Sequence, residues 1–157
     1  MTVIQDSIVI DREAEIVRKV FLDFAAYPTW KSSCIQKITV TTPSKTSNDS
    51  IVPGDTLQVR IVLPNSKKEN VFDPEVVENS EERFSWKGKL VLDSIFSGKH
   101  TFEFCPIENG SKTKFVQTEE FNGLLAWPIL KFIGKDTVKG FSEFNQRFKE
   151  HVEKCEF

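Results

Sequence analysis

The chain has 157 residues, a formal net charge of −2 and interspersed acidic and basic side chains, so its length suits one domain covering residues 1–157. The absence of a long Lys and Arg run argues against a nucleic-acid partner. Because no stretch approaches the ~18 consecutive apolar residues of a membrane span and no signal-peptide pattern opens the chain, we expect a soluble, cytoplasmic protein without stable membrane insertion.

Hydrophobic periodicity predicts a strand and then a helix at the start of the chain. Residues 7–11 alternate, whereas Ile16, Val20 and Phe24 recur at helical spacing within a helix predicted from Glu13 to Ala25. Asp11 has the side chain of an N-cap residue, and the Tyr-Pro pair at residues 27–28 ends the helix.

The pattern then returns to alternation, which predicts about seven antiparallel strands in all. A polar segment at residues 41–55 is expected to be an exposed loop, and Asn109-Gly110 is a strong hairpin signal. The further predicted strands are Ile35 to Thr41, the run holding Leu57, Val59, Ile61 and Leu63, Asn70 to Glu78, Arg83 to Leu90, Ser94 to Cys105, and Lys112 to Phe121; turns include Leu63 to Ser66.

A long helix is predicted from about Trp127 to Lys154, and its centre carries small residues. Gly134, Thr137 and Gly140 lie on or beside the apolar stripe, although glycine costs roughly 1 kcal/mol relative to alanine inside a helix. They indicate either a hollow beneath the helix or a close helix-to-sheet contact or kink. With 14 Phe against 3 Trp and 1 Tyr, the chain must bury a thick core or line an apolar hole.

Four sequence segments resemble the START-like, SRPBCC superfamily over nearly the whole chain. They are AAYPTW (residues 25–30), VFDPEVVENSEERFSWKGKL (71–90), SGKHTFEF (97–104) and TKFVQTEEFNGLL (113–125). The resemblance is closest to the polyketide cyclase/dehydrase-type subgroup. One departure is that Lys31-Ser32 stands where this subgroup often has Asn-Pro.

The resemblance implies an α+β helix-grip fold: a curved antiparallel sheet wrapped around the long C-terminal helix, with one or two short helices after the first strand. It also implies a ligand pocket between the sheet and that helix. It does not imply a reaction, because lipid carriers, receptors, cyclases and storage-type binders share this fold.

Three polar side chains fall on the inner, phenylalanine-bearing face of two neighbouring strands. His100 shares its face with Phe102, whereas Gln117 and Glu119 share theirs with Phe115. A carboxylate in an apolar site must be paired, and His100 is the natural partner of Glu119. The group can anchor the polar end of an apolar ligand, move a proton in a cyclase or dehydratase with His100 and Glu119 as catalytic candidates, or only satisfy its own hydrogen bonds.

The inner faces together predict the lining of a pocket for a small, mostly hydrophobic molecule. The predicted lining residues are Trp30, Leu57, Val59, Ile61, Phe84, Trp86, Phe96, His100, Phe102, Phe115, Gln117, Glu119, Phe121, Thr137 and Phe141.

No metal or cofactor is expected. Cys34, Cys105 and Cys155 are widely spaced without a CxxC pair, and the two histidines lie far apart. His151, near the end of the last helix, is expected to be solvated, and the lone phenol of Tyr27 to have a packing role.

An apolar cluster at residues 124–128 (LLAWP) lies where the last strand gives way to the helix. If exposed, it is a portal lip or a contact for a membrane or a protein partner; if buried, it plugs the end of the fold.

Overall fold

The computed structural model describes residues 1–32, 34–45, 51–65, 67, 69–89 and 95–157. One sheet has five antiparallel strands in the order β1-β8-β7-β6-β5, and a second has three in the order β2-β3-β4. The elements in chain order are β1 (Thr2–Ile10), α1 (Ala14–Leu22), the 3-10 helix η1 (Phe24–Ala26), β2 (Ile35–Val40), β3 (Leu57–Val62), β4 (Glu69–Phe72), β5 (Glu75–Asn79), β6 (Arg83–Lys89), β7 (Ser97–Ile107), β8 (Lys112–Asn122) and α2 (Ala126–Lys154).

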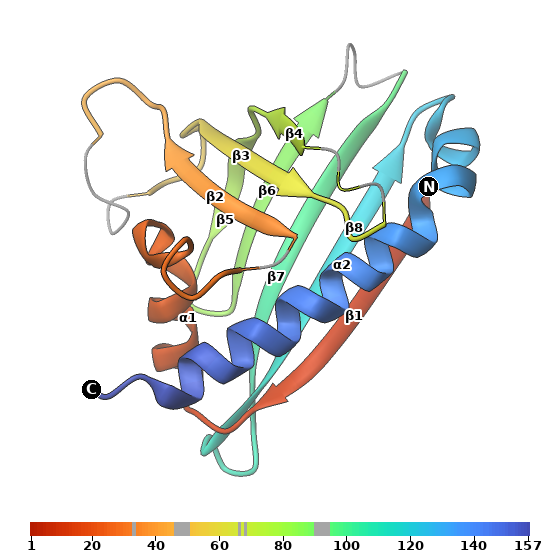
Figure 1. Ribbon diagram of the computed structural model, residues 1–157. Helices are drawn as coiled ribbons and strands as arrows, with labels where there is room; N and C mark the ends of the chain where they lie inside the picture. Colours follow the sequence, from red (N-terminus) through yellow and green to blue (C-terminus); the bar gives the residue numbers. More distant parts are fainter. Residues whose placement is uncertain (33, 46–50, 66, 68, 90–94) are drawn as a thin grey trace.

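The long helix α2 crosses the face of the five-stranded sheet, with the three-stranded sheet and α1 beside it (Figure 1). This is the predicted α+β arrangement of a curved antiparallel sheet around a C-terminal helix. The hairpin predicted at Asn109-Gly110 is also confirmed, because Ile107 pairs with Lys112 across it.

The single strand predicted from Asn70 to Glu78 is wrong. The chain forms β4 and then β5, which belong to different sheets, and the interruption falls at Asp73-Pro74. Proline has no N–H to donate to a ladder. The Pro74 carbonyl instead accepts from the Leu57 N–H at 2.9 Å, so the chain changes sheets at this proline.

The start of α1 also differs from the prediction. Glu13 is the N-cap and makes no side-chain capping bond. Asp11 does not cap the helix; its backbone N–H donates to Glu153 Oε1 at 2.8 Å, which ties the end of β1 to α2. The first strand is longer than predicted and begins at Thr2.

Some sequence-based predictions fall outside the described residues: the strand ends at Leu90 and Ser94, the turn residue Ser66, and residues 46–50 of the polar segment. In the described part of that segment, Ile51 and Asp55 are buried, so the prediction that the whole segment is exposed is wrong there. Asp55 is held inward because its Oδ2 accepts from the Val52 N–H at 2.8 Å and pairs with Lys45 at 3.3 Å.

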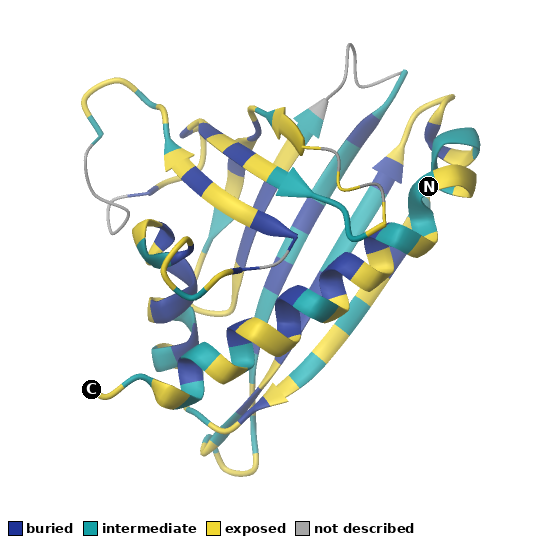
Figure 2. Ribbon diagram, viewed as in Figure 1, coloured by how far each residue is buried: buried dark blue, intermediate teal, exposed yellow. Residues whose placement is uncertain are grey.

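Phenylalanine rings fill the interior beneath α1 and the C-terminal half of α2. The buried ring of Phe21 lies 4.5 Å from Phe102, 5.5 Å from Phe104 and 6.0 Å from Phe148, measured between centroids. Dark blue residues accordingly gather on the facing sides of the sheet and α2 in Figure 2. At this end of the molecule the phenylalanine side chains therefore form a thick core.

The two glycines of α2 have different surroundings. A Cβ added to Gly140 would lie 3.0 Å from Cys34 Sγ, whereas one added to Gly134 would meet only Ile4 Cδ1, at 4.0 Å. Gly140 thus permits a close contact between α2 and the chain beside the smaller sheet. A close contact of this kind was one of the two interpretations given above for the small residues of this helix.

Candidate functional site

The register of β7 and β8 brings the three predicted polar side chains together. His100 is paired with Glu119, and Phe102 with Gln117. The His100 Nδ1 atom lies 2.9 Å from Glu119 Oε2, and its Nε2 atom lies 3.0 Å from Gln117 Oε1. The predicted inward direction and the pairing of His100 with Glu119 are confirmed.

This polar group continues to two residues on other elements. The Gln117 amide donates to Asn145 Oδ1 at 2.5 Å, and the Asn145 amide donates to Asp6 Oδ2 at 2.9 Å. We call the series Glu119, His100, Gln117, Asn145 and Asp6 the polar chain. It joins β8, β7, α2 and β1.

Sequence reasoning missed Asp6, because the first strand was predicted to begin only at Ser7. The signal was present, since Asp6 continues the alternation of β1 and is opposite Gln117 in the sheet. Asn145 was not among the predicted site residues, and both of its partners lie on strands, Gln117 on β8 and Asp6 on β1.

The directions of these hydrogen bonds follow from the carboxylate at each end. An ionised carboxylate only accepts, so Asn145 turns its amide nitrogen to Asp6 and its oxygen to Gln117. Gln117 then presents its own oxygen to His100. Both ring nitrogens of His100 therefore face acceptors. All hydrogen bonds of the polar chain are made when each of these nitrogens carries a hydrogen.

The imidazole of His100 is enclosed by aromatic rings. It stacks on Phe102 at 4.1 Å and 17° and on Phe141 at 4.9 Å and 30°, while Trp86 meets it edge-on at 5.4 Å. His100 is only 5% exposed. Its faces and both its nitrogens are thus occupied by the protein.

Glu119 is more accessible than the histidine it holds. Its side chain is 15% exposed, against 6% for that of His100. The oxygen that does not contact His100, Oε1, lies over Gly98, where an added Cβ would be 2.6 Å away. The missing side chain at residue 98 therefore makes room for this carboxylate.

The predicted lining residues divide between two apolar clusters. The larger core contains Leu57, Val59, Phe84, Trp86, Phe102 and Phe115, with the half-buried Trp30 and Ile61 against it. The smaller cluster contains Phe121 and Phe141, with Phe96 at its edge. His100 lies between the two, because its ring touches Phe102 in one and Phe141 in the other.

Two of the predicted lining residues make contacts elsewhere in the protein. Trp30 packs on Tyr27, Phe144 and Phe148 at the far end of α2, and Thr137 donates its hydroxyl to the Ile133 carbonyl of its own helix at 2.9 Å.

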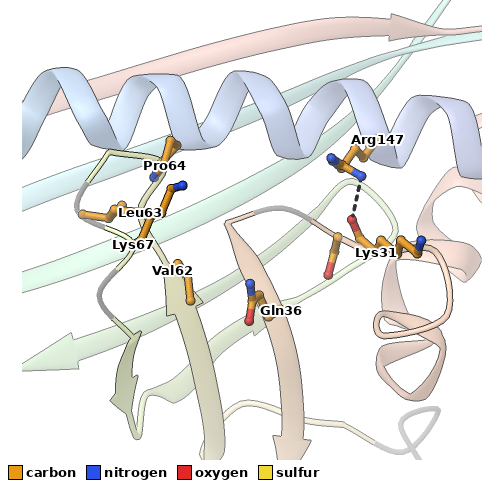
Figure 3. Close-up of a pocket in the computed structure, with 8 residues that line it drawn as sticks. Lys31, Gln36, Val62, Leu63, Pro64, Lys67 and Arg147 are labelled. Atoms are coloured by element: carbon orange, nitrogen blue, oxygen red, sulfur yellow. Dashed lines mark hydrogen bonds between the residues drawn. The ribbon is translucent and has the colours of Figure 1, made fainter.

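A hollow of about 300 Å³ lies between α2 and strands β2 and β3 (Figure 3). The Arg147 guanidinium reaches across it to the Lys31 carbonyl at 3.2 Å. The lining residues are Lys31, Ser32, Gln36, Val62, Leu63, Pro64, Lys67 and Arg147. This hollow is basic and includes the Lys31-Ser32 pair, but none of the predicted ligand-binding residues is among its described lining.

The remaining candidates have structural surroundings. The Tyr27 hydroxyl donates to the Phe21 carbonyl at 2.7 Å in the core, which agrees with a packing role, and burial raises its pKa. His151 is not simply solvated as predicted: its ring stacks on Trp30 at 5.2 Å and 12°, and burial lowers its pKa.

Within the described residues, no group of three His, Cys, Asp or Glu side chains is placed to hold a metal ion. In the same part of the chain, the helices are all too short or too polar to cross a bilayer.

The sheet, the gripping helix and the inward polar chain define the class: this is an α+β helix-grip protein. The chain belongs to the family described as "Polyketide cyclase / dehydrase and lipid transport", whose family model matches residues 1–153. That description covers both cyclase-type enzymes and carriers of lipid-like molecules. No curated protein matches the chain significantly.

Solved structures share the fold at low sequence identity. The Zhui aromatase/cyclase from a Streptomyces species has a TM-score of 0.67 at 8% identity, with 97% of this chain and 93% of that chain covered. A START superfamily protein from Mycobacterium smegmatis has a TM-score of 0.67 at 17% identity, with coverage of 96% and 97%. The protein jhp0584 from Helicobacter pylori has a TM-score of 0.70 at 12% identity, with coverage of 96% and 88%.

Proposed function

We propose that the protein binds a small, mostly apolar molecule beside Glu119, between β7, β8 and the first half of α2. The observation that carries this proposal is the partly exposed Glu119 carboxylate, which a buried histidine holds in place among aromatic rings. An apolar wall with a few fixed polar groups is the usual composition of a ligand site. Membership of a cyclase and lipid-transport family supports the same choice.

The accessible group also indicates the polarity of the ligand. Glu119 Oε1 is an acceptor, so it would bind a hydroxyl, phenol or amine of the ligand. Phe96 and Phe121, whose rings stack at 5.7 Å, lie with Phe141 in the adjacent cluster and would contact its apolar body.

Ligand retention tests this proposal. The protein is incubated with a lipid extract, separated from free lipid and measured by native mass spectrometry. The unmodified protein should retain a ligand, and Glu119→Gln should bind it roughly 10- to 150-fold more weakly, since a charge-assisted hydrogen bond contributes about 1.5–3 kcal/mol. Glu120→Gln is the matched control, because Glu120 neighbours Glu119 on β8 and its side chain is directed to the other face of the sheet.

Two results would contradict ligand binding at Glu119: no ligand retained by the unmodified protein, or equal retention by the two glutamine variants. Circular dichroism and urea unfolding of both variants would show whether a loss reflects the site or the fold.

A cyclase or dehydratase is the second candidate, and the short His100–Glu119 contact is the observation that favours it. His100 would have to release Gln117 before it could take a proton from a substrate, so Glu119 is the better-placed base. This candidate predicts that the retained molecule changes mass with time, by loss of water for a dehydratase. A constant mass favours the carrier.

A further inference from the structure

Large apolar side chains are exposed at the beginning of α2 and in the turn before it. Leu124 is 86% exposed, Trp127 68% and Phe132 85%, and Leu125 is exposed as well. The first turns of the helix are accordingly yellow and teal in Figure 2, in contrast to the dark blue positions further along. The apolar cluster predicted at residues 124–128 is therefore largely exposed and does not plug the fold.

The exposure follows from the way α2 meets the sheet. Between its first residue and Phe141, α2 buries Ala126, Thr137, Gly140 and Phe141, which lie on one side of the helix. At 100° per residue, Phe132 falls about 140° from Thr137 and is directed away from the sheet, whereas Trp127 falls about 40° from Phe141 and is exposed because it lies in the first turn of the helix. An apolar patch of this kind on a folded chain marks an interaction surface.

Cationic side chains are interleaved with these apolar residues. Lys131 and Lys135 lie on the outer side of the same turns, and Lys131 Nζ lies 5.5 Å from the centroid of the Trp127 ring. Residues 123–135 contain no Asp or Glu, although the whole chain has a net charge of −2. The next acidic residue is Asp136, whose Oδ1 atom accepts a hydrogen bond from the Asn65 N–H at 2.9 Å.

We propose that this surface, formed by Leu124, Leu125, Trp127, Lys131, Phe132 and Lys135, docks on the surface of an anionic lipid bilayer. Tryptophan and phenylalanine side chains enter the headgroup region, and lysines beside them extend to lipid phosphates and carboxylates. Each lysine near an anionic membrane strengthens binding roughly fivefold. The docking is peripheral, since the described helices cannot span a membrane.

The charges favour a bilayer over a second copy of the chain. Two copies related by a twofold axis would bring the same surface together, and Lys131 and Lys135 would then face lysines without an acidic partner in residues 123–135. An anionic bilayer supplies the missing negative charge. This proposal does not depend on which ligand, if any, binds beside Glu119.

Vesicle flotation tests the docking. The full chain is mixed with vesicles of phosphatidylcholine alone or of phosphatidylcholine with phosphatidylserine. We expect it to float with the phosphatidylserine vesicles and at least tenfold less with phosphatidylcholine alone, and added salt should weaken the binding. The double variant Trp127→Ser/Phe132→Ser should lose tenfold or more of the affinity, and Lys131→Glu/Lys135→Glu should lose the preference for phosphatidylserine.

Val71→Ser is the matched control, because Val71 is a half-exposed apolar residue on β4, outside this surface, and its replacement should leave binding unchanged. Three results would overturn the proposal: no binding to either vesicle, equal binding by the unmodified protein and the double serine variant, or a concentration-dependent dimer in light scattering that the serine variant abolishes. Because the replaced side chains are exposed, unchanged circular dichroism is expected for every variant.

Discussion

At the scale of single residues, the polar chain is a set of groups that depend on one another. Gln117 is fully buried, and it is the only described link between His100 and Asn145. A buried polar group that loses its partner bears the full cost of leaving water, whereas a completed hydrogen bond contributes only modestly. The polar chain therefore does more to fix one arrangement of β7, β8 and α2 than to add stability.

Gln117→Leu should lower the free energy of unfolding by about 2–3 kcal/mol, because His100 Nε2 and Asn145 Oδ1 are left without partners. Urea denaturation followed by circular dichroism measures this change. Gln5→Leu is the matched control, since Gln5 is an exposed residue of β1 in the same sheet. A loss no larger than that of the control would mean that the polar chain makes no energetic contribution to the fold.

At the scale of elements, α2 has a buried half and a more exposed half, and its two glycines belong to different contacts. Gly140 lets the helix approach Cys34 and Pro64, which precede and follow strands of the smaller sheet. Gly134 has no comparable contact. The same residue type thus serves close packing at one position and leaves the helix weaker at the other.

Alanine at these two positions should have opposite effects. Gly134→Ala should stabilise the protein by roughly 0.5–1 kcal/mol, because alanine is the better helix former and its Cβ meets only Ile4 at 4.0 Å. Gly140→Ala should destabilise it, because its Cβ would lie 3.0 Å from the buried Cys34 Sγ. The midpoints of thermal unfolding compare the two, and equal shifts of the same sign would contradict this account.

At the scale of the whole molecule, two buried groups make stability depend on pH at both extremes. The Val52 N–H, together with Lys45, lowers the pKa of Asp55 below its ordinary value of 3.8. Burial, together with the nearby carboxylates of Asp136, Glu143 and Glu119, raises the pKa of Cys34 from 9.0 to about 12. Each shift favours the form that the folded protein already contains near neutral pH.

The free energy of unfolding should therefore fall on both sides of a plateau. On the acid side, the Asp55 contribution is present above pH 3.8 and is lost as the pH falls through the lowered pKa. On the alkaline side, the unfolded thiol of Cys34 ionises from about pH 9.0 while the folded one stays protonated, so stability declines towards pH 12. Urea titrations across this range measure both slopes.

Asp55→Asn should flatten the acid slope and Cys34→Ser the alkaline slope, whatever either substitution does to stability at pH 7. Unchanged slopes in both variants would show that other groups control the pH dependence.

The sequence by itself determined which residues face the interior of the main strands. Alternation has a period of two residues, and the hairpin at Asn109-Gly110 fixes the register of its strands, so both signals are local. They were sufficient to place His100 beside Glu119 and Gln117, and the motifs around them were sufficient to predict the family.

Only the tertiary structure decided how these strands meet the rest of the chain. The bonds from Asn145 to Gln117 and to Asp6 join residues far apart in sequence, and no local pattern encodes them. The same holds for the change of sheet at Pro74 and for the exposure of Trp127 and Phe132. The physical reason is that the orientation of a helix on a sheet is set by close packing of side chains from several elements, as at Gly140 and Cys34.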